Sequence, residues 1–135
     1  NRNQFYSINL TNGILKWKQN INSSVRPVVI DDLVFSFSNE GYLFIIDKKK
    51  GDIIRITDVF NRFKQKRRNQ ILPIGFIVNK DEIMLTTNNG RLLIIDISTG
   101  KTVSILKIDN QQISRPFIFN DKILLAKDNS IIRLD

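Results

Sequence analysis

The side chains best able to perform chemistry in this sequence are carboxylates and cations, because its 135 residues include no histidine and no cysteine. Serine-histidine-aspartate catalysis, cysteine-histidine catalysis and the common zinc sites cannot be assembled from this chain alone. Two acidic pairs, Asp31-Asp32 and Asp81-Glu82, offer oxygen ligands of the kind that Ca²⁺ prefers. Each pair stands between two short apolar runs, where acids usually form solvated turns. We therefore predict no metal site and no catalytic site.

Basic residues are the second group of candidates, since 21 of them against 13 acids give a formal net charge of +8. The run Lys48-Lys49-Lys50 falls in a turn, where most soluble residues serve equally well. A second basic run lies in an insertion, at Arg62, Lys64, Lys66, Arg67 and Arg68. Only Phe60 and Phe63 interleave it, which is too few aromatic rings for a nucleic-acid stacking surface.

This second run is our candidate contact site for an acidic partner surface or an anionic membrane surface. A solvated loop without a partner is the simpler alternative, and nucleic acid is the least favoured one. We expect all five side chains to be exposed on one loop. Replacing Lys66, Arg67 and Arg68 by Ser should then weaken binding and leave the melting temperature nearly unchanged.

The elements that must position these groups are marked by a recurring turn. Three times an apolar run enters Asp or Asn, with a Gly four residues later, at Asn9 and Gly13, Asp47 and Gly51, and Asp96 and Gly100. The interval is about 40 residues, with one copy lengthened by the basic insertion, and such a period built from short strands indicates a β-propeller or a related array.

Alignment on these turns extends the repeat in both directions, because residues 28–47 match 77–96 without a gap and also match 117–135. Short turns divide each unit into four predicted strands. The third strands are nearly unbroken apolar runs, which is typical of a sheet covered on both faces. The predicted strands are Val28–Ile30, Leu33–Phe37, Tyr42–Ile46 and Ile53–Thr57, then Phe76–Val78, Ile83–Thr87, Leu92–Ile95 and Thr102–Lys107.

The predicted fold class is therefore all-β, made of four-stranded antiparallel propeller blades. We expect a partial blade at 1–19, a blade at 25–60, the basic insertion at 61–73, a blade at 74–108 and an incomplete blade at 115–135. Residues 58–68 are the only weak candidate for a helix. Because propellers close with about four to eight blades, these roughly three blades should belong to a larger protein or self-associate.

The turns resemble the repeat of the PQQ-like β-propeller family, whose units contain the pattern A-x-D-x-x-T-G-x-x-x-W. The first copy has Asn9, Gly13 and Trp17 at the corresponding positions. The second and third copies keep the Asp and the Gly but have Arg55 and Ser104 in place of the tryptophan. The resemblance implies that Trp17 packs between neighbouring blades.

Within this family, the terminal hairpin at 123–135 is similar to the last blade of periplasmic lipoproteins that take part in outer-membrane β-barrel assembly. That resemblance implies a non-catalytic scaffold on the periplasmic side of the outer membrane, which binds other proteins through its loops and needs no cofactor. The alternative it leaves open is the C-terminal part of a PQQ-dependent dehydrogenase whose active site lies upstream. Those enzymes stack the quinone on Trp and use a vicinal Cys pair with a calcium site, so we predict no quinone binding by this chain.

Overall fold

The computed structural model describes residues 3–135, which form four small antiparallel sheets and one short helix. The first two sheets contain β1 (Phe5–Ile8) and β2 (Leu15–Gln19), then β3 (Val28–Ile30), β4 (Leu33–Phe37), β5 (Tyr42–Asp47) and β6 (Ile53–Asp58). The helix α1 (Gln65–Arg68) follows, then β7 (Pro73–Val78), β8 (Glu82–Thr87), β9 (Arg91–Asp96) and β10 (Thr102–Lys107), and finally β11 (Phe117–Phe119), β12 (Lys122–Lys127) and β13 (Ser130–Leu134).

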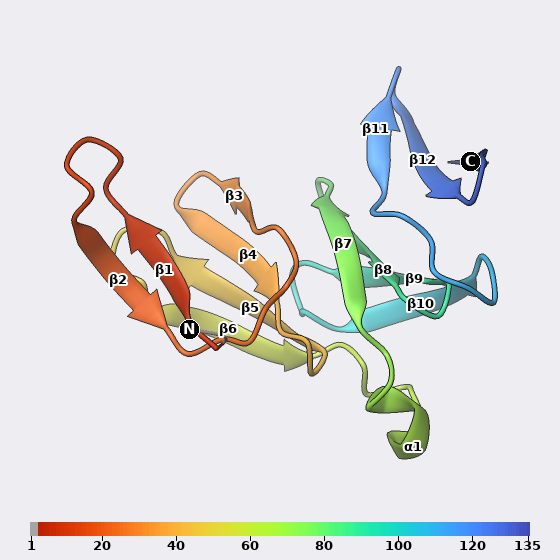
Figure 1. Cartoon of the computed structure of the whole chain (residues 1–135), viewed down its shortest axis with the longest axis horizontal. Coiled ribbons are helices and arrows are strands. Elements are labelled where there is room, and N and C mark those ends of the chain that lie inside the picture. Colours follow the sequence, from red (N-terminus) through yellow and green to blue (C-terminus); the bar gives the residue numbers. More distant parts are fainter. Residues whose placement is uncertain (1–2) are drawn as a thin grey trace.

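Each sheet is a meander in which strands that follow one another in the chain are hydrogen-bonded neighbours. Figure 1 shows the sheets succeeding one another along the molecule, from β1–β2 to β11–β13, with α1 projecting from one side. The strand numbers are two, four, four and three. This arrangement confirms the prediction of four-stranded antiparallel propeller blades.

Most of the hydrophobic core lies between the sheets instead of within any one of them. The larger cluster joins the second sheet to the third and includes Phe37, Leu43, Phe76 and Leu85, all at most 1% exposed. A smaller cluster joins the first two sheets. Along β5 the residues alternate between these two clusters, Leu43 and Ile45 facing the larger one and Phe44 and Ile46 the smaller one, which explains why the strand is apolar on both faces.

The meander also sorts the turns onto two opposite sides of the molecule, because successive strands run in opposite directions. We call the side with the turns at 9–13, 47–51 and 96–100 the docking rim; it also contains the short turns at 31–32 and 80–81. We call the opposite side the α1 rim. It contains the turns at 38–41 and 88–90 and the connections between sheets at 20–27, 59–72 and 108–116.

The three recurring turns of the docking rim have one common geometry. In each turn the Gly N–H donates to the backbone carbonyl of the Asn or Asp four residues earlier, at 2.8 Å in all three turns. The glycines have φ angles of 72°, 79° and 70°, a region that other residues occupy only with strain. A side-chain oxygen of Asn9, Asp47 or Asp96 accepts a further hydrogen bond from backbone N–H groups in its turn. The repeated sequence pattern is therefore a repeated turn.

Candidate protein-binding surface

The docking rim joins neighbouring sheets through the residue four positions after each of the first two turn glycines, Gly13 and Gly51. Trp17, four residues after Gly13 in β2, is 9% exposed, and its Nε1–H donates to the carbonyl oxygen of Lys48 at 2.8 Å. Lys48 belongs to the recurring turn of the next sheet. A Cβ atom on Gly51 would lie 2.4 Å from Cγ of Trp17. Position 51 therefore requires glycine for two reasons, the packing of the indole and the positive φ angle of the turn. Trp17 therefore packs between blades.

Arg55 performs the same docking at the next interface. Its Nη1 donates to the carbonyl oxygens of Ile97 at 3.0 Å and Ser98 at 2.8 Å, in the recurring turn of the third sheet. Ile97 stands one residue after Asp96, as Lys48 stands one residue after Asp47. The sequence pattern placed Arg55 at the tryptophan position but did not identify it as a docking residue.

On the α1 rim, the connection at 59–72 is anchored by aromatic side chains. Phe60 is fully buried, and Phe63 packs against the main cluster with its ring edge toward Phe60, at a centroid distance of 5.3 Å. Phe60 also lies directly beneath Gly41, where a Cβ atom would come within 2.2 Å of its ring. The two aromatic residues of the basic run are therefore core residues, and α1 is held against the second sheet.

Arg68 contradicts the expectation that all five basic residues of the insertion are exposed. Its guanidinium binds both carboxylate oxygens of Asp58 at 2.7 Å, and its side chain is 16% exposed. It also donates to the carbonyl oxygen of Glu40 at 3.2 Å and lies 5.5 Å from the ring centroid of Tyr42. The hydrogen bonds that Arg68 donates to Asp58 raise the pKa of Arg68. Arg68 is a structural anchor, because the carboxylate of Asp58, the carbonyl of Glu40 and the ring of Tyr42 hold its side chain in place.

The other four basic residues of the insertion, Arg62, Lys64, Lys66 and Arg67, are exposed as predicted. Among these only Arg62 has a side-chain hydrogen bond within residues 3–135, from its Nη1 to the carbonyl oxygen of Val103 at 3.3 Å. The connection at 59–72 contains no acidic residue. The nearest acid along the chain, Asp58, is already bound by Arg68. Within residues 3–135 no ion pair joins any of these four side chains to an acid.

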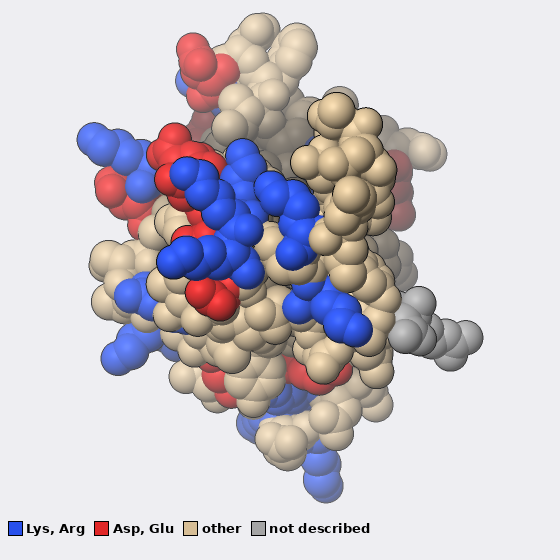
Figure 2. Space-filling view, turned by 90° about the vertical axis from the view of Figure 1, so that its left-hand side faces the viewer, with Lys and Arg blue, Asp and Glu red and all other residues tan. Residues whose placement is uncertain are grey.

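The basic run on the docking rim has a different environment. Lys48, Lys49 and Lys50 share their turn with Asp47, and Nζ of Lys49 lies 4.0 Å from Asp32. Figure 2 shows the side of the molecule that lies on the left in Figure 1, where basic and acidic side chains lie among one another. This triplet of lysines has nearby acids and serves as an internal comparison for the exposed cations beside α1.

The acidic pairs of the docking rim form turns, in agreement with the simpler interpretation of their sequence. Asp31 has a φ of 53°, and the backbone carbonyl of Asp32 accepts a hydrogen bond from the N–H of Lys48 at 2.8 Å. The carbonyl of Asp81 accepts the equivalent bond from Ile97 at 3.1 Å. Among residues 3–135 no three His, Cys, Asp or Glu side chains gather closely enough to hold a metal ion. The one helix described is too short to cross a membrane.

Comparison with known proteins agrees with the geometry of the turns and sheets. The family model described as outer membrane protein assembly factor BamB matches residues 1–57. Those residues include the first two recurring turns. The resemblance to outer-membrane assembly lipoproteins in the sequence analysis rested instead on the terminal hairpin at 123–135. A search of curated proteins found no match.

Several solved structures share the fold. The crystal structure of BamB from Moraxella catarrhalis superposes with a TM-score of 0.73 at 12% identity, over 97% of this chain and 37% of that one. The Cps50 (Swd1) β-propeller domain of Myceliophteria thermophila gives 0.68 at 13% identity, over 92% and 42%. A europium-containing methanol dehydrogenase gives 0.58 at 16% identity, over 76% and 21%.

These structural likenesses establish the architecture and leave the role open, since identities this low are evidence for the fold alone. The chain spans 37% of the BamB structure that it matches. The recurring turns, the docking of Trp17 and the BamB family match in residues 1–57 nevertheless agree with one another. The chain therefore resembles the PQQ-like β-propeller repeats of BamB, and its residues 1–57 match the BamB family model.

Proposed function

We propose that this chain is part of a non-catalytic, periplasmic scaffold that binds other proteins during outer-membrane protein assembly. The observation that supports this function most directly is the match of residues 1–57 to the BamB family model. The α1 rim supplies the contact surface in this proposal, because Arg62, Lys64, Lys66 and Arg67 are exposed there and none of them has an ion-pair partner within residues 3–135.

The chemistry of that rim favours an acidic protein surface as partner. Exposed cations attract acidic groups over a distance of about 8 to 10 Å at moderate salt, and they act mainly on the rate of encounter. The buried ring of Phe60 and the ion pair of Arg68 with Asp58 fix the position of α1. The exposed cations therefore lie on a segment with a defined position. Anionic lipid head groups are the competing ligand for the same charges.

A quinone-dependent enzyme is the alternative function, and the structural likeness to a methanol dehydrogenase is the reason to consider it. Trp17 is the single tryptophan of the chain, and its indole is packed on Gly51 with its N–H bound to Lys48. That indole is therefore occupied in the contact between sheets. We accordingly favour the scaffold and propose that this polypeptide has no oxidoreductase activity.

The test of the scaffold compares two triple variants that remove equal charge from opposite rims. In the first, Lys64, Lys66 and Arg67 are replaced by Ser; in the second, Lys48, Lys49 and Lys50 are replaced by Ser. We expect the first variant to bind the periplasmic domains of a barrel-assembly protein about tenfold more weakly at low salt, and the second to bind like the parent. The difference should shrink as salt is added.

Both triple variants should melt close to the parent temperature, because none of the six side chains is buried. Equal binding by both variants would contradict the assignment of the contact to the α1 rim. A different result would be that the parent binds anionic vesicles but not the protein domains, and that the first variant no longer binds the vesicles. This result would identify a lipid ligand and overturn the scaffold.

A further inference from the structure

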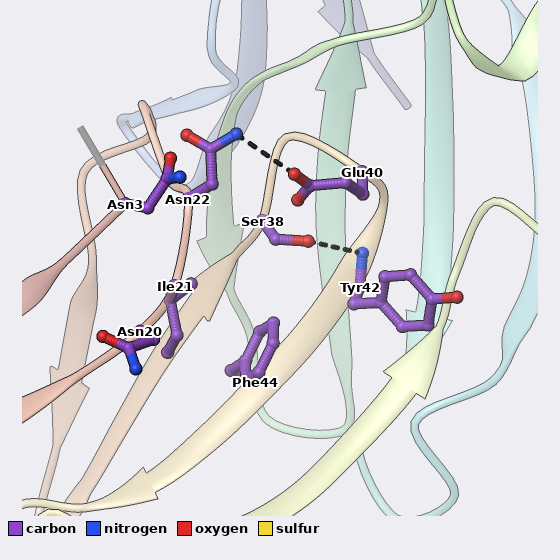
Figure 3. Close-up of a pocket in the computed structure, with 8 residues that line it drawn as sticks. All are labelled: Asn3, Asn20, Ile21, Asn22, Ser38, Glu40, Tyr42 and Phe44. Carbon is purple, nitrogen blue, oxygen red and sulfur yellow. Dashed lines mark hydrogen bonds between the residues drawn. The ribbon is translucent and has the colours of Figure 1, made fainter.

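A second feature of the α1 rim is a hollow of about 440 Å³ between the first and second sheets, a volume typical of ligand pockets. Figure 3 shows Asn3, Asn20 and Asn22 on one side of it and Glu40 and Tyr42 on the other. The apolar side chains of Ile21 and Phe44 lie between the two sides.

The hollow continues toward α1. A second hollow, of about 430 Å³, shares Glu40 and Tyr42 with the first and is lined on its far side by Gln65, Arg68 and Asn69. The ring of Tyr42 stands where the two hollows meet and is directed away from the asparagines. Together the two hollows form a groove that runs from the first sheet to α1.

The walls of this groove are held in place before any ligand binds. Nδ2 of Asn22 donates to the carboxylate of Glu40 at 3.1 Å, and the N–H of Asn39 donates to the carbonyl of Asn22 at 2.7 Å. Arg68 holds the ring of Tyr42 and the carbonyl of Glu40 from the other side. A groove with fixed walls loses less conformational entropy when a ligand binds.

The polar groups of the groove match a peptide backbone. A carboxamide has both N–H donors and a carbonyl acceptor, as a peptide group does. Within residues 3–135, the side-chain amides of Asn3 and Asn20 have no hydrogen-bond partner, so both can bind a ligand. The open shape of both hollows suits an extended segment better than a compact small molecule.

Charge along the groove is uneven and selects the partner's side chains. The end beside α1 is lined by Gln65, Arg68 and Asn69, and the exposed cations Lys64, Lys66 and Arg67 are next to these residues in sequence, so their field reaches this end of the groove. Glu40 lies where the two hollows meet. Burial alone would raise its pKa, but hydrogen bonds from Asn22, from its own backbone and from Ser38 together lower it. Acidic side chains are therefore favoured beside α1, and neutral amides or hydroxyls beside Glu40.

We propose that this groove binds an extended segment of a partner protein, with neutral polar residues between the asparagines and Glu40 and acidic residues beside α1. The proposal rests on the protein-binding function proposed above and specifies the form of its ligand. It places the contact in a groove, in addition to the charged surface of α1.

The experiment uses the full chain and three short fluorescein-labelled peptides that share a Thr and Gln half. Their other half contains Glu in the first peptide, Gln in the second and Lys in the third. We expect the Glu peptide to bind about tenfold more tightly than the Gln peptide, and the Lys peptide to bind more weakly still. Backbone amide signals in NMR spectra should shift in residues 20–22, 38–42 and 65–69.

A matched pair of asparagine variants separates the groove from general charge attraction. Asn20→Ala removes an exposed amide from the groove, whereas Asn110→Ala removes an exposed amide from another connection of the same rim. We expect about fivefold weaker binding of the Glu peptide to the first variant and unchanged binding to the second. Both variants should melt like the parent, because neither side chain is buried.

Equal affinity of the two asparagine variants, equal binding of the Glu and Gln peptides, or signal shifts confined to the docking rim would each overturn the groove. Anionic vesicles that shift the same signals when no peptide binds would overturn it too. The triple variant of Lys64, Lys66 and Arg67 could lose binding to the barrel-assembly domains while Asn20→Ala binds the Glu peptide like the parent. That result would support the scaffold function and overturn the groove. If the Glu peptide binds as expected and those domains do not, the groove stands without that function.

Discussion

Arg55 and Trp17 both dock one sheet on the next by donating hydrogen bonds to backbone carbonyls of the neighbouring turn. An indole is therefore not the one side chain that can make this contact. Trp17 supplies a single N–H and a large packed surface, whereas Arg55 supplies two bonds from one guanidinium nitrogen. The Trp17 contact should therefore depend more on packing and the Arg55 contact more on hydrogen bonding to a charged group.

Replacing Arg55 by Ala should lower the free energy of unfolding by about 1 to 2 kcal/mol, since two carbonyl oxygens lose a charged donor and one of the two bonds is partly buried. Urea-induced unfolding measures the change. Arg67→Ala removes the same kind of side chain from an exposed position and is the control. Equal unfolding free energies of the two variants would show that Arg55 contributes nothing to docking.

The acids of the recurring turns predict a specific acid sensitivity. A hydrogen bond from the backbone N–H of Lys50 leads the interactions that lower the pKa of Asp47, and one from the hydroxyl of Ser98 leads those that lower the pKa of Asp96. Both groups have an ordinary value of 3.8. Their stabilisation is therefore complete above that pH and is lost as the pH falls through the lower, folded-state pKa.

When the pH is lowered below 3.8, the melting temperature of the double variant Asp47→Asn, Asp96→Asn should fall less than that of the parent. Near neutral pH it should still fold, because Asn9 forms the same turn and its Oδ1 accepts the N–H of Thr11 at 2.8 Å. Melting curves recorded across the acid range test this. Parallel loss of stability in parent and variant would mean that these two carboxylates are not responsible.

At the scale of elements, the insertion is held by one ion pair and two aromatic rings. Arg68→Ser should lower the unfolding free energy by about 1 to 2 kcal/mol, because it leaves the partly buried Asp58 without its partner. The double variant Lys66→Ser, Arg67→Ser should be as stable as the parent, since both side chains are exposed. Thermal or urea unfolding decides, and an unchanged Arg68→Ser variant would contradict the anchoring role.

The strands of the second and third sheets could be predicted from sequence because their turns repeat at fixed offsets. The helix α1 was indicated only weakly, within the candidate range 58–68, because it is a single turn with no buried residue and no side-chain cap. Its place is set by Phe60, Phe63 and Arg68, which contact other elements. A run of cations also gives no signal of which member has a carboxylate partner, so Arg68 was grouped with its exposed neighbours.

The groove was beyond sequence reasoning for a related reason. Asn20 and Asn22 belong to a connection between sheets, whereas Glu40 belongs to a turn eighteen residues after Asn22. Each segment has an ordinary loop composition, and only the packing of the first sheet on the second brings them together. The five cations of the insertion were identified from sequence as a group, and four of them are exposed.

For the whole molecule, the size of the two clusters predicts how stability is distributed. The second and third sheets share the larger cluster, whereas β1–β2 rests on the smaller one around Trp17 and Ile46. Amide hydrogens of β4, β5, β8 and β9 should therefore exchange most slowly, and those of β1, β2 and β13 fastest. Native-state hydrogen exchange measures this order. Uniform protection across all sheets would show that the chain unfolds as one cooperative unit.

The receiving partner in each docking contact is a backbone carbonyl, at Lys48 in one sheet and at Ile97 and Ser98 in the next. A carbonyl is present whatever the side chain, so duplicated units can diverge in turn sequence without losing their fit to a neighbour. Divergence would be restricted at the turn glycine, where Gly51 and Gly100 leave no room for a Cβ atom. An ancestral gene encoding one such unit could thus have lengthened by tandem copying, with new surfaces arising in the turns while the joints between units stayed the same.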